Sequence, residues 1–510
     1  MEERVRRIEE ASPPQDPRRW RRRFFILLGA LVLLPLLLLA YALVRFGGDT
    51  AVVYDSAEEH FKYGSTGGER ESGFPYWIFQ ALPRVCDHRL PGGYRSLGLI
   101  YEEGKDLPIG MSKRRYTGID RTFLNCAVCH TSTVRESPQS KPRIVLGMPA
   151  NTFDVMGFER FFFECAADSR FSAEYIIPEV RRLQQIKGED LDLLERYLIY
   201  PAAIAIMRDR LLMLRGRFDF VLKQAEQGLP WGPGRVDTFN SAKVIFNFPM
   251  EKLDPKELLG ASDFPSIWNQ RQKRGMQLHW DGNNSVVEER NKSAAFGTGT
   301  TPPTIDLKAI GRVEEWIQDV KQPPYPFPID ASLAGRGSLV YKQYCLSCHG
   351  ASGKNFSGEK VGKVTPIEDV GTDRRRLDSY TYTLAVNQGT LYAGYPHRFH
   401  HFRKTFGYAN MPLDGLWLRA PYLHNGSVPS LRDLLEPAAN RPKTFYRGYD
   451  VYDTKNIGFV STLPEENGRK YFRYDTTAEG NSNAGHEGPA YGTHLPPDDK
   501  AALLEYLKTF

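Results

Sequence analysis

The longest apolar run in the chain lies near its N-terminus, where residues 24–44 include no charged side chain. At a rise of about 1.5 Å per residue, a helix of this length crosses the roughly 30 Å hydrocarbon core of a bilayer. The sequence RRWRRR at 18–23 keeps the preceding segment in the cytoplasm. We therefore expect a cytoplasmic tail at 1–23, a single-pass anchor at 24–44 in a bacterial inner membrane, and the rest of the chain in the periplasm.

A cleaved signal peptide is the competing interpretation of this run. The tripeptide Ala40-Tyr41-Ala42 resembles a cleavage site. The run is longer than the hydrophobic region of an ordinary signal peptide, however, and this length favours a retained anchor.

A second pattern, typical of helices, extends over about residues 175–227. Apolar side chains spaced three and four positions apart form one stripe along a helix face: Ile204, Met207, Leu211, Leu214, Phe218 and Val221. Such a stripe could form a wall over a substrate or cofactor pocket, but plain packing against other helices is much commoner. We expect a helical insert whose stripe lies in the core.

The C-terminal half is bounded by two predicted helices and a proline-rich segment. Residues 331–344 show an amphipathic pattern, and 501–510 form a closing helix after Pro496-Pro497. The sequence PPYPFP at 323–328 is a stiff connector and the best domain boundary in the chain. The prediction is a mainly α-helical protein with a first domain at 45–322, a connector at 323–330 and a second domain at 331–510.

Composition and charge are those of a globular protein with little attraction for nucleic acid. The chain has 510 residues, enough for two or three domains. Its net charge of +6 is concentrated at the N-terminus, where residues 1–23 hold eight arginines against five acidic residues and Arg45 adds one positive charge. Only about +2 is left on the remainder, so we expect no nucleic-acid partner.

Two copies of the motif Cys-x-x-Cys-His carry the chemistry: CAVCH at 126–130 and CLSCH at 345–349. Two thiols at this spacing can each form a thioether with a haem vinyl group, and the following histidine becomes the proximal iron ligand. A redox dithiol needs no such histidine, and a four-ligand zinc site needs both cysteine pairs to converge. We predict two covalently bound haem c groups, attached through Cys126, Cys129, Cys345 and Cys348, with His130 and His349 as iron ligands.

Two further features leave alternatives open. Cys86 and Cys165 can pair in an oxidising compartment or remain two buried free thiols. Trp280, in the sequence LHWDG at 278–282, fits an electron relay between haems, a wall over a haem, or a buried core tryptophan.

Several motifs together resemble those of a known family. They are the two haem motifs, LHWDG at 278–282, VGTD at 370–373 and RAPYLHNGS at 419–427. This set resembles the bacterial dihaem cytochrome c peroxidase/MauG superfamily, and within it the branch that includes the rubber oxygenases RoxA and RoxB. The resemblance covers roughly residues 54–510 and is weakest in the helical insert.

The resemblance implies a division of labour between the two haems. The haem held by His130 would be high-spin and reactive, with one face open to peroxide or dioxygen. The haem held by His349 would be six-coordinate and would supply or store electrons, with Trp280 near the path between them. His130 and Trp280 are therefore the residues that we assign to catalysis.

Two departures from the superfamily weaken a peroxidase assignment. Arg290 stands where these peroxidases carry a glutamine for acid–base chemistry. Gly407-Tyr408 stands where they take a methionine as ligand of the electron-transferring haem. Tyr408 would suit a MauG-like ligand, whereas a histidine would suit a RoxA-like one.

The sixth ligand of the His349 haem must be one residue of a larger set: His397, His400, His401, Tyr408, Met411, His424, His486 and His494. Bis-histidine ligation is what the RoxA-like resemblance favours. We expect His486, in the loop ahead of the closing helix, slightly before His424.

Two classes of function follow. The first is an oxidoreductase that activates peroxide or dioxygen at the His130 haem, acts on an organic substrate or the peroxide itself, and exchanges electrons with a small redox protein. The second is an electron carrier in which both haems are six-coordinate. Axial ligands are set by folding, and the sequence alone does not choose between these classes.

Overall fold

In the computed structural model, the described residues are 17–510, and the first sixteen residues of the predicted cytoplasmic tail lie outside them. The chain divides into two compact units. The smaller unit ends at Thr50 and includes the hairpin tip Arg115–Asp120. The larger unit consists of Ala51–Arg114 and Arg121–Phe510.

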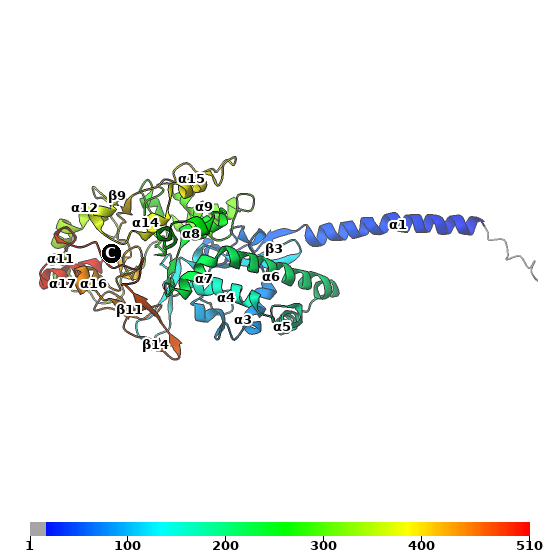
Figure 1. The fold of residues 1–510 in the computed structure, drawn as a ribbon, viewed down its shortest axis with the longest axis horizontal. Helices are drawn as coiled ribbons and strands as arrows, with labels where there is room; N and C mark the ends of the chain where they lie inside the picture. The colour runs from blue at the N-terminus through cyan, green and yellow to red at the C-terminus, as the bar shows by residue number, and fades with distance from the viewer. Residues whose placement is uncertain (1–16) are drawn as a thin grey trace, which may run out of the picture. The chain divides into compact units, whose positions relative to one another are not determined.

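The smaller unit is dominated by the long helix α1 (Pro17–Phe46), drawn in blue in Figure 1. Its segment Arg18–Phe46 has a mean hydropathy of 2.7 and is long and apolar enough to cross a membrane. The predicted run at 24–44 falls entirely within this helix, and its leucines are exposed. A single span near an N-terminus is the arrangement expected of a single-pass anchor, although a signal sequence shares it.

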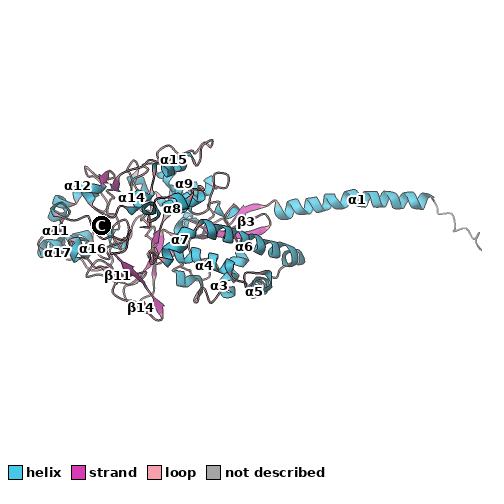
Figure 2. Ribbon diagram, in the orientation of Figure 1, coloured by secondary structure: helices cyan, strands magenta, loops and turns pink. Residues whose placement is uncertain are grey.

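The larger unit consists mainly of short helices joined by long ordered loops, with only small sheets between them (Figure 2). Its helices are α2 (Ala57–Tyr63), α3 (Tyr76–Val85), α4 (Val155–Ala167), α5 (Ala173–Ile186), α6 (Tyr200–Arg217), α7 (Asp219–Glu226), α8 (Thr238–Ile245), α9 (Val287–Gly297), α10 (Leu307–Ile317), α11 (Ala331–Tyr344), α12 (Leu346–His349), α13 (Ile367–Val370), α14 (Arg375–Ser379), α15 (Tyr382–Thr390), α16 (Leu431–Leu434) and α17 (Pro497–Leu507). A π-helix, η4 (Glu195–Ile199), leads into α6, and a short 3-10 helix, η3 (Cys126–Val128), holds the first cysteine motif.

The strands form one four-stranded sheet, in the order β1-β3-β4-β2, and several antiparallel pairs. The sheet consists of β1 (Asp49–Ala51), β2 (Phe74–Pro75), β3 (Met111–Tyr116) and β4 (Ile119–Leu124). The pairs are β5 (Thr131–Val134) with β6 (Arg143–Leu146), β7 (Arg235–Val236) with β8 (Ser262–Asp263), β9 (Val364–Pro366) with β10 (Gly407–Ala409), β11 (Thr444–Arg447) with β16 (Phe472–Asp475), β12 (Tyr452–Asp453) with β13 (Gly458–Phe459), and β14 (Glu465–Glu466) with β15 (Arg469–Lys470). In the β5–β6 pair, Thr131 lies opposite Leu146, directly after the first cysteine motif.

A core rich in aromatic rings fills the first half of the larger unit. Phe74 stacks on Phe162 of α4 with 4.4 Å between ring centres. The predicted helical stripe joins this core, because five of its six side chains are buried and Leu214 packs against them. The packing interpretation of the stripe is therefore confirmed. A disulfide joins Cys86 and Cys165 within the same core. Of the two alternatives left open by the sequence, the paired cysteines are therefore confirmed and the free thiols are not.

The second half is built on the crossing of α11 and α17. The predicted helix at 331–344 is confirmed as α11, whereas the closing helix begins earlier than predicted, at Pro497. The two helices cross so closely that a Cβ atom at Gly337 would lie 1.9 Å from the carbonyl oxygen of Ala502. Only glycine permits this approach.

The two halves share one hydrophobic cluster. Trp268 and Met148 from the first half lie in the same buried group as Trp417 and Leu503 from the second. The proline-rich segment packs on this group, since the indole of Trp417 donates to the carbonyl oxygen of Pro323 at 3.1 Å. The segment packs on this cluster with half-buried rings, and the boundary at 323–330 stays a prediction.

Candidate functional site

The first cysteine motif is positioned by Asn125, which caps η3. The Asn125 side chain accepts a hydrogen bond from the backbone N–H of Ala127 at 3.0 Å. Its amide nitrogen donates to the carbonyl oxygen of Gly64 at 3.0 Å and so ties the motif to the end of α2. The buried amide fixes where Cys126 and Cys129 point.

His130, the next residue, is oriented by a main-chain carbonyl. Its Nδ1 lies 2.9 Å from the carbonyl oxygen of Pro265. A carbonyl can only accept, so Nδ1 carries the proton and Nε2 keeps a free lone pair. Burial lowers the pKa of His130 to about 4, and the ring is neutral at physiological pH. A neutral, oriented imidazole is the form that binds a metal.

The second motif repeats this arrangement at the end of α11. Cys345 caps α11, α12 carries the rest of the motif, and the hydroxyl of Tyr341 donates to the carbonyl oxygen of Gly350 at 2.8 Å. His349 Nδ1 lies 2.8 Å from the carbonyl oxygen of Met411. Burial lowers the pKa of His349 as well. Both histidines are thus held in the same tautomer by the same kind of partner.

The four motif thiols are half-buried, and none of them forms a disulfide. Burial raises the pKa of Cys126 to about 11 and those of Cys129 and Cys345 to about 12. A reactive dithiol needs the opposite shift, because the thiolate is the nucleophile. Across residues 17–510, no group of three or more His, Cys, Asp or Glu side chains is arranged to hold a metal ion. The pairs do not converge as a zinc site requires, and the donor set instead fits thioether attachment of haem c.

His486 faces His349. Their ring centres lie 6.1 Å apart. A metal–imidazole bond is about 2 Å long and the ring centre lies about 1 Å beyond the nitrogen, so two imidazoles on opposite sides of one metal have their centres about 6 Å apart. His486 Nδ1 is buried and has no hydrogen-bond partner among the described residues. These two observations fit an iron ligand.

The loop that carries His486 is held in place by a buried arginine. Arg441, 3% exposed, donates to the carbonyl oxygen of Gly485 at 2.9 Å and to that of His486 at 3.3 Å. The backbone N–H of His486 donates to Val370 at 2.7 Å. His486 has a φ of 47°, a left-handed conformation that is unusual for a residue with a side chain. The main chain that carries the His486 ring is therefore held by several contacts with residues outside its own segment.

The other ligand candidates have different partners. His424 stacks on Tyr408 with 4.1 Å between ring centres, and its Nε2 lies 3.0 Å from the Tyr408 hydroxyl. The main-chain carbonyl oxygen of Met411 is the partner of His349 Nδ1. The remaining histidines have other surroundings. The backbone N–H groups of His400 and His401 donate to Glu289, the ring of His397 lies tilted against Tyr392 with 4.8 Å between ring centres, and His494 is exposed.

Trp280 connects the segments that orient the two proximal histidines. Its indole N–H donates to the carbonyl oxygen of Asp263 at 2.7 Å, two residues before Pro265. Its own carbonyl oxygen accepts from the backbone N–H of Ala409 at 2.8 Å, two residues before Met411. A hydrogen-bonded path therefore runs from His130 through Trp280 to His349. All of these partners are main-chain groups, which every residue type provides, so the sequence does not reveal them.

Two polar residues near His130 extend this site. Burial lowers the pKa of His279 well below its ordinary value, with smaller contributions from Arg290, Arg376 and His130. Arg290 is itself enclosed, its Nε has no hydrogen-bond partner among residues 17–510, and burial lowers its pKa to about 10. His279 was absent from the predicted ligands, although its place beside Trp280 was a signal that could have drawn attention to it.

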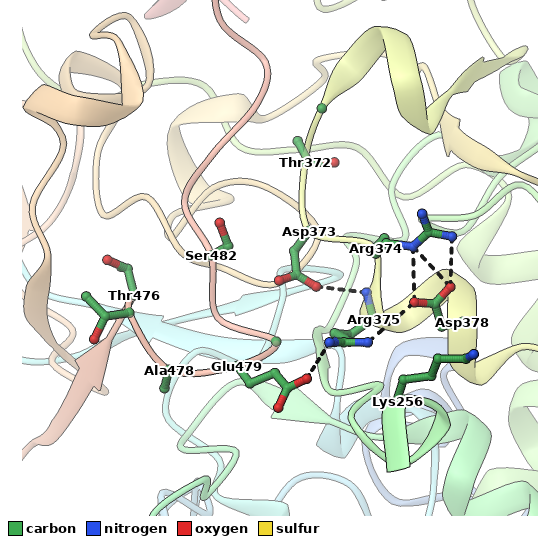
Figure 3. Close-up of a pocket in the computed structure, with 13 residues that line it drawn as sticks. Lys256, Thr372, Asp373, Arg374, Arg375, Asp378, Thr476, Ala478, Glu479 and Ser482 are labelled. Carbon is green, nitrogen blue, oxygen red and sulfur yellow. Dashed lines mark hydrogen bonds and ion pairs between the residues drawn. The ribbon is translucent and has the colours of Figure 1, made fainter. Parts of the chain in front are cut away.

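One surface pocket is a separate feature. It encloses about 660 Å³ and lies between α14 and the loop at 476–482 (Figure 3). Its two arginines are paired with acidic residues of the same lining, as in the Arg375–Glu479 contact drawn there. The motif cysteines and proximal histidines do not line it. Asp373 of its lining links it to the site, because the Asp373 carbonyl oxygen accepts from the Tyr408 hydroxyl at 2.7 Å.

We predict that D281N destabilises the protein strongly. Asp281 follows Trp280, is fully buried and pairs with the buried Arg376 at 3.1 Å. Removing the carboxylate leaves the guanidinium buried without its counter-charge, which costs about 3–5 kcal/mol of unfolding free energy. Denaturant unfolding of D281N measures this loss.

The matched control is D319N. Asp319 pairs with Arg271 at 2.7 Å, but both side chains are more than half exposed. Such a pair contributes at most about 1 kcal/mol. Equal stability losses in the two variants would show that the Asp281 pair does not support this site.

Comparisons with known proteins point to the same chemistry. A family model described as RoxA-like, cytochrome c-like matches residues 407–446, the stretch that contains Tyr408, Met411 and His424. "Uncharacterized protein y4iJ" of Sinorhizobium fredii (strain NBRC 101917 / NGR234) is 29% identical over 486 residues, which cover 76% of each chain. "Uncharacterized protein y4iM" of the same organism is 30% identical over 293 residues, which cover 49% of this chain and 64% of that protein. The chain therefore contains a RoxA-like, cytochrome c-like domain, and such a domain implies haem c.

Proposed function

We propose that the chain is a membrane-anchored dihaem cytochrome c that acts as an oxidoreductase. One haem is attached to Cys126 and Cys129, and the other to Cys345 and Cys348. The observation that carries this proposal is that both motif histidines are neutral and oriented alike, each by a main-chain carbonyl. The RoxA-like match at 407–446 supports it independently.

The two sites differ in what lies opposite the proximal histidine. His349 faces His486 at the spacing of a bis-histidine site. His130 forms no comparable ring pair among residues 17–510, although His279 lies close enough for the charges of the two rings to interact. The difference supports a closed second site for electron transfer and a first site with one face open to a small oxidant.

The protein supplies the environment of the first site. A haem with an open face can bind and reduce peroxide or dioxygen. Arg290 lies near enough to His130 for their charges to interact, and its unpartnered Nε would be able to donate a hydrogen bond to an oxygen atom bound there. His279 stays neutral there and can exchange a proton. Arg290 thus replaces the glutamine expected from the peroxidases.

Trp280 provides the electron route between the sites. Its indole packs against the buried cluster of Ile367, Leu377 and Tyr408. The indole N–H is bonded to the segment that orients His130, and the main-chain carbonyl to the segment that orients His349. A fixed aromatic ring between two redox groups shortens the gap that an electron must cross. A small redox protein would deliver electrons to the second haem, and an organic molecule or the peroxide itself would be the substrate.

The compartment follows from α1 and from the haem chemistry. α1 supports a single-pass anchor in a bacterial inner membrane, with the arginine cluster at 18–23 on the cytoplasmic side. The Cys86–Cys165 disulfide supports an oxidising compartment for the larger unit. The periplasm meets both conditions.

The first prediction of this proposal concerns the number of haems. Two haem equivalents per chain are expected in the pyridine haemochrome assay, and C126A/C129A should retain one, because one pair of thioether sites is lost. C86A/C165A is the matched control, since it also removes two cysteines but leaves both motifs intact. Two haems in C126A/C129A would show that the first motif does not attach haem.

The second prediction concerns the sixth ligand of the His349 haem. H486A should lose the low-spin ferric EPR signal, because one strong-field imidazole is removed from the iron. H424A should retain it, since His424 is engaged with Tyr408, and the exposed His494 provides a third variant, H494A, as control. An unchanged signal in H486A would return Tyr408 and Met411 as candidates.

A further inference from the structure

Helix α6 has apolar side chains on two opposite faces. Its inner face packs against α4 and α5, and Ile204, Met207 and Leu211 on that face are 2%, 6% and 4% exposed. A surface helix of a globular protein normally carries charged or polar residues on the other face. The outer face of α6 departs from this pattern.

The outer face is an exposed apolar surface. At about 100° per residue, it is centred opposite Met207 and Leu211. On α6, Ile206 is 55% exposed and Met213 57%. Leu198 and Tyr197 of η4, at 62% and 66%, and Leu193, at 75%, extend the surface ahead of α6. Ala202 and Ala205, also exposed, complete it. Contiguous exposed apolar surfaces of this kind mark sites of protein or membrane interaction.

The edges of this face are positively charged. Residues 193–217 contain five arginines and two acidic residues. Arg210 and Arg215 are exposed and fall on opposite edges of the outer face. One acidic residue, Asp209, lies on the face itself. An apolar face bordered by arginines is the pattern of a helix that lies in a membrane interface, because the long side chains reach back to the headgroups.

The covalent connection keeps a bilayer close to the larger unit. α1 ends at Phe46, and the larger unit begins at Ala51. The four residues between them span at most about 20 Å even when fully extended. The effective concentration of membrane around the larger unit is therefore high, so a modest affinity per molecule suffices for contact.

We propose that the outer face of α6 rests in the headgroup region of an anionic phospholipid membrane, the one that α1 anchors. The proposal rests on the anchor proposed above, but it is independent of the haem sites. A second copy of the chain is the competing occupant. Two such faces packed together would bring Arg210 and Arg215 of both copies, four arginines, near only two Asp209 side chains, whereas anionic headgroups neutralise the arginines.

The test places single nitroxide labels on the full-length protein in phosphatidylcholine vesicles containing phosphatidylglycerol. I206C and M213C report the outer face, and L339C is the matched control, because Leu339 is 68% exposed on α11. We expect accessibility to a water-soluble nickel chelate to be several-fold lower at 206 and 213 than at 339. Accessibility to oxygen, which concentrates in lipid, should be several-fold higher. In R210Q/R215Q, the protection of the 206 label should weaken most in vesicles with phosphatidylglycerol.

Three results would overturn the proposal in distinguishable ways. Equal nickel accessibility at 206 and 339 in protein that floats with the vesicles would show an anchored chain whose α6 stays in water. Broadening of the spectrum by a second label would show that two copies pack together. Protein that does not float with the vesicles would show that α1 is not an anchor, and both proposals about the membrane would fall.

Discussion

Trp280 connects the two segments whose carbonyl groups orient His130 and His349, and the arrangement of both sites depends on this connection. The carbonyl oxygens of Pro265 and Met411 fix one tautomer at each histidine and leave Nε2 available for iron. Neither carbonyl lies in a regular element, so their positions depend on tertiary contacts alone. Movement of the tryptophan would disturb both sites together.

Buried charges keep this region rigid. Arg376 pairs with Asp281 directly after Trp280, and Arg447 pairs with Asp263, the residue that accepts the indole hydrogen bond. Buried ion pairs add little to net stability, because desolvation offsets most of their attraction. Breaking one pair leaves an uncompensated charge, however, and alternative packings of the segment are therefore costly. The same constraint keeps the aromatic ring fixed between the two sites.

The sequence was sufficient for the regular elements. The helix α11 and the stripe on α6 follow from spacing within one segment, and the two Cys-x-x-Cys-His motifs are local in the same sense, while haem attachment to them stays a prediction. The Cys86–Cys165 pairing, the carbonyl partners and the approach of His486 to His349 depend on residues that are far apart in the chain. His486 was preferred from its loop position and a family resemblance, whereas its contacts with Arg441 carried no sequence signal. The exposed apolar face of α6 is not apparent from the sequence, because the spacing of the buried stripe already accounts for the apolar residues of this helix.

The central claim is that one haem has an open face and the other is closed by His486. The stoichiometry of carbon monoxide binding to the fully reduced protein tests this most directly, because carbon monoxide binds only to an iron with a free position. One carbon monoxide per two haems is the result that the account predicts. None would show that both irons are closed and that the protein is an electron carrier. Two would show that His486 does not hold the second iron.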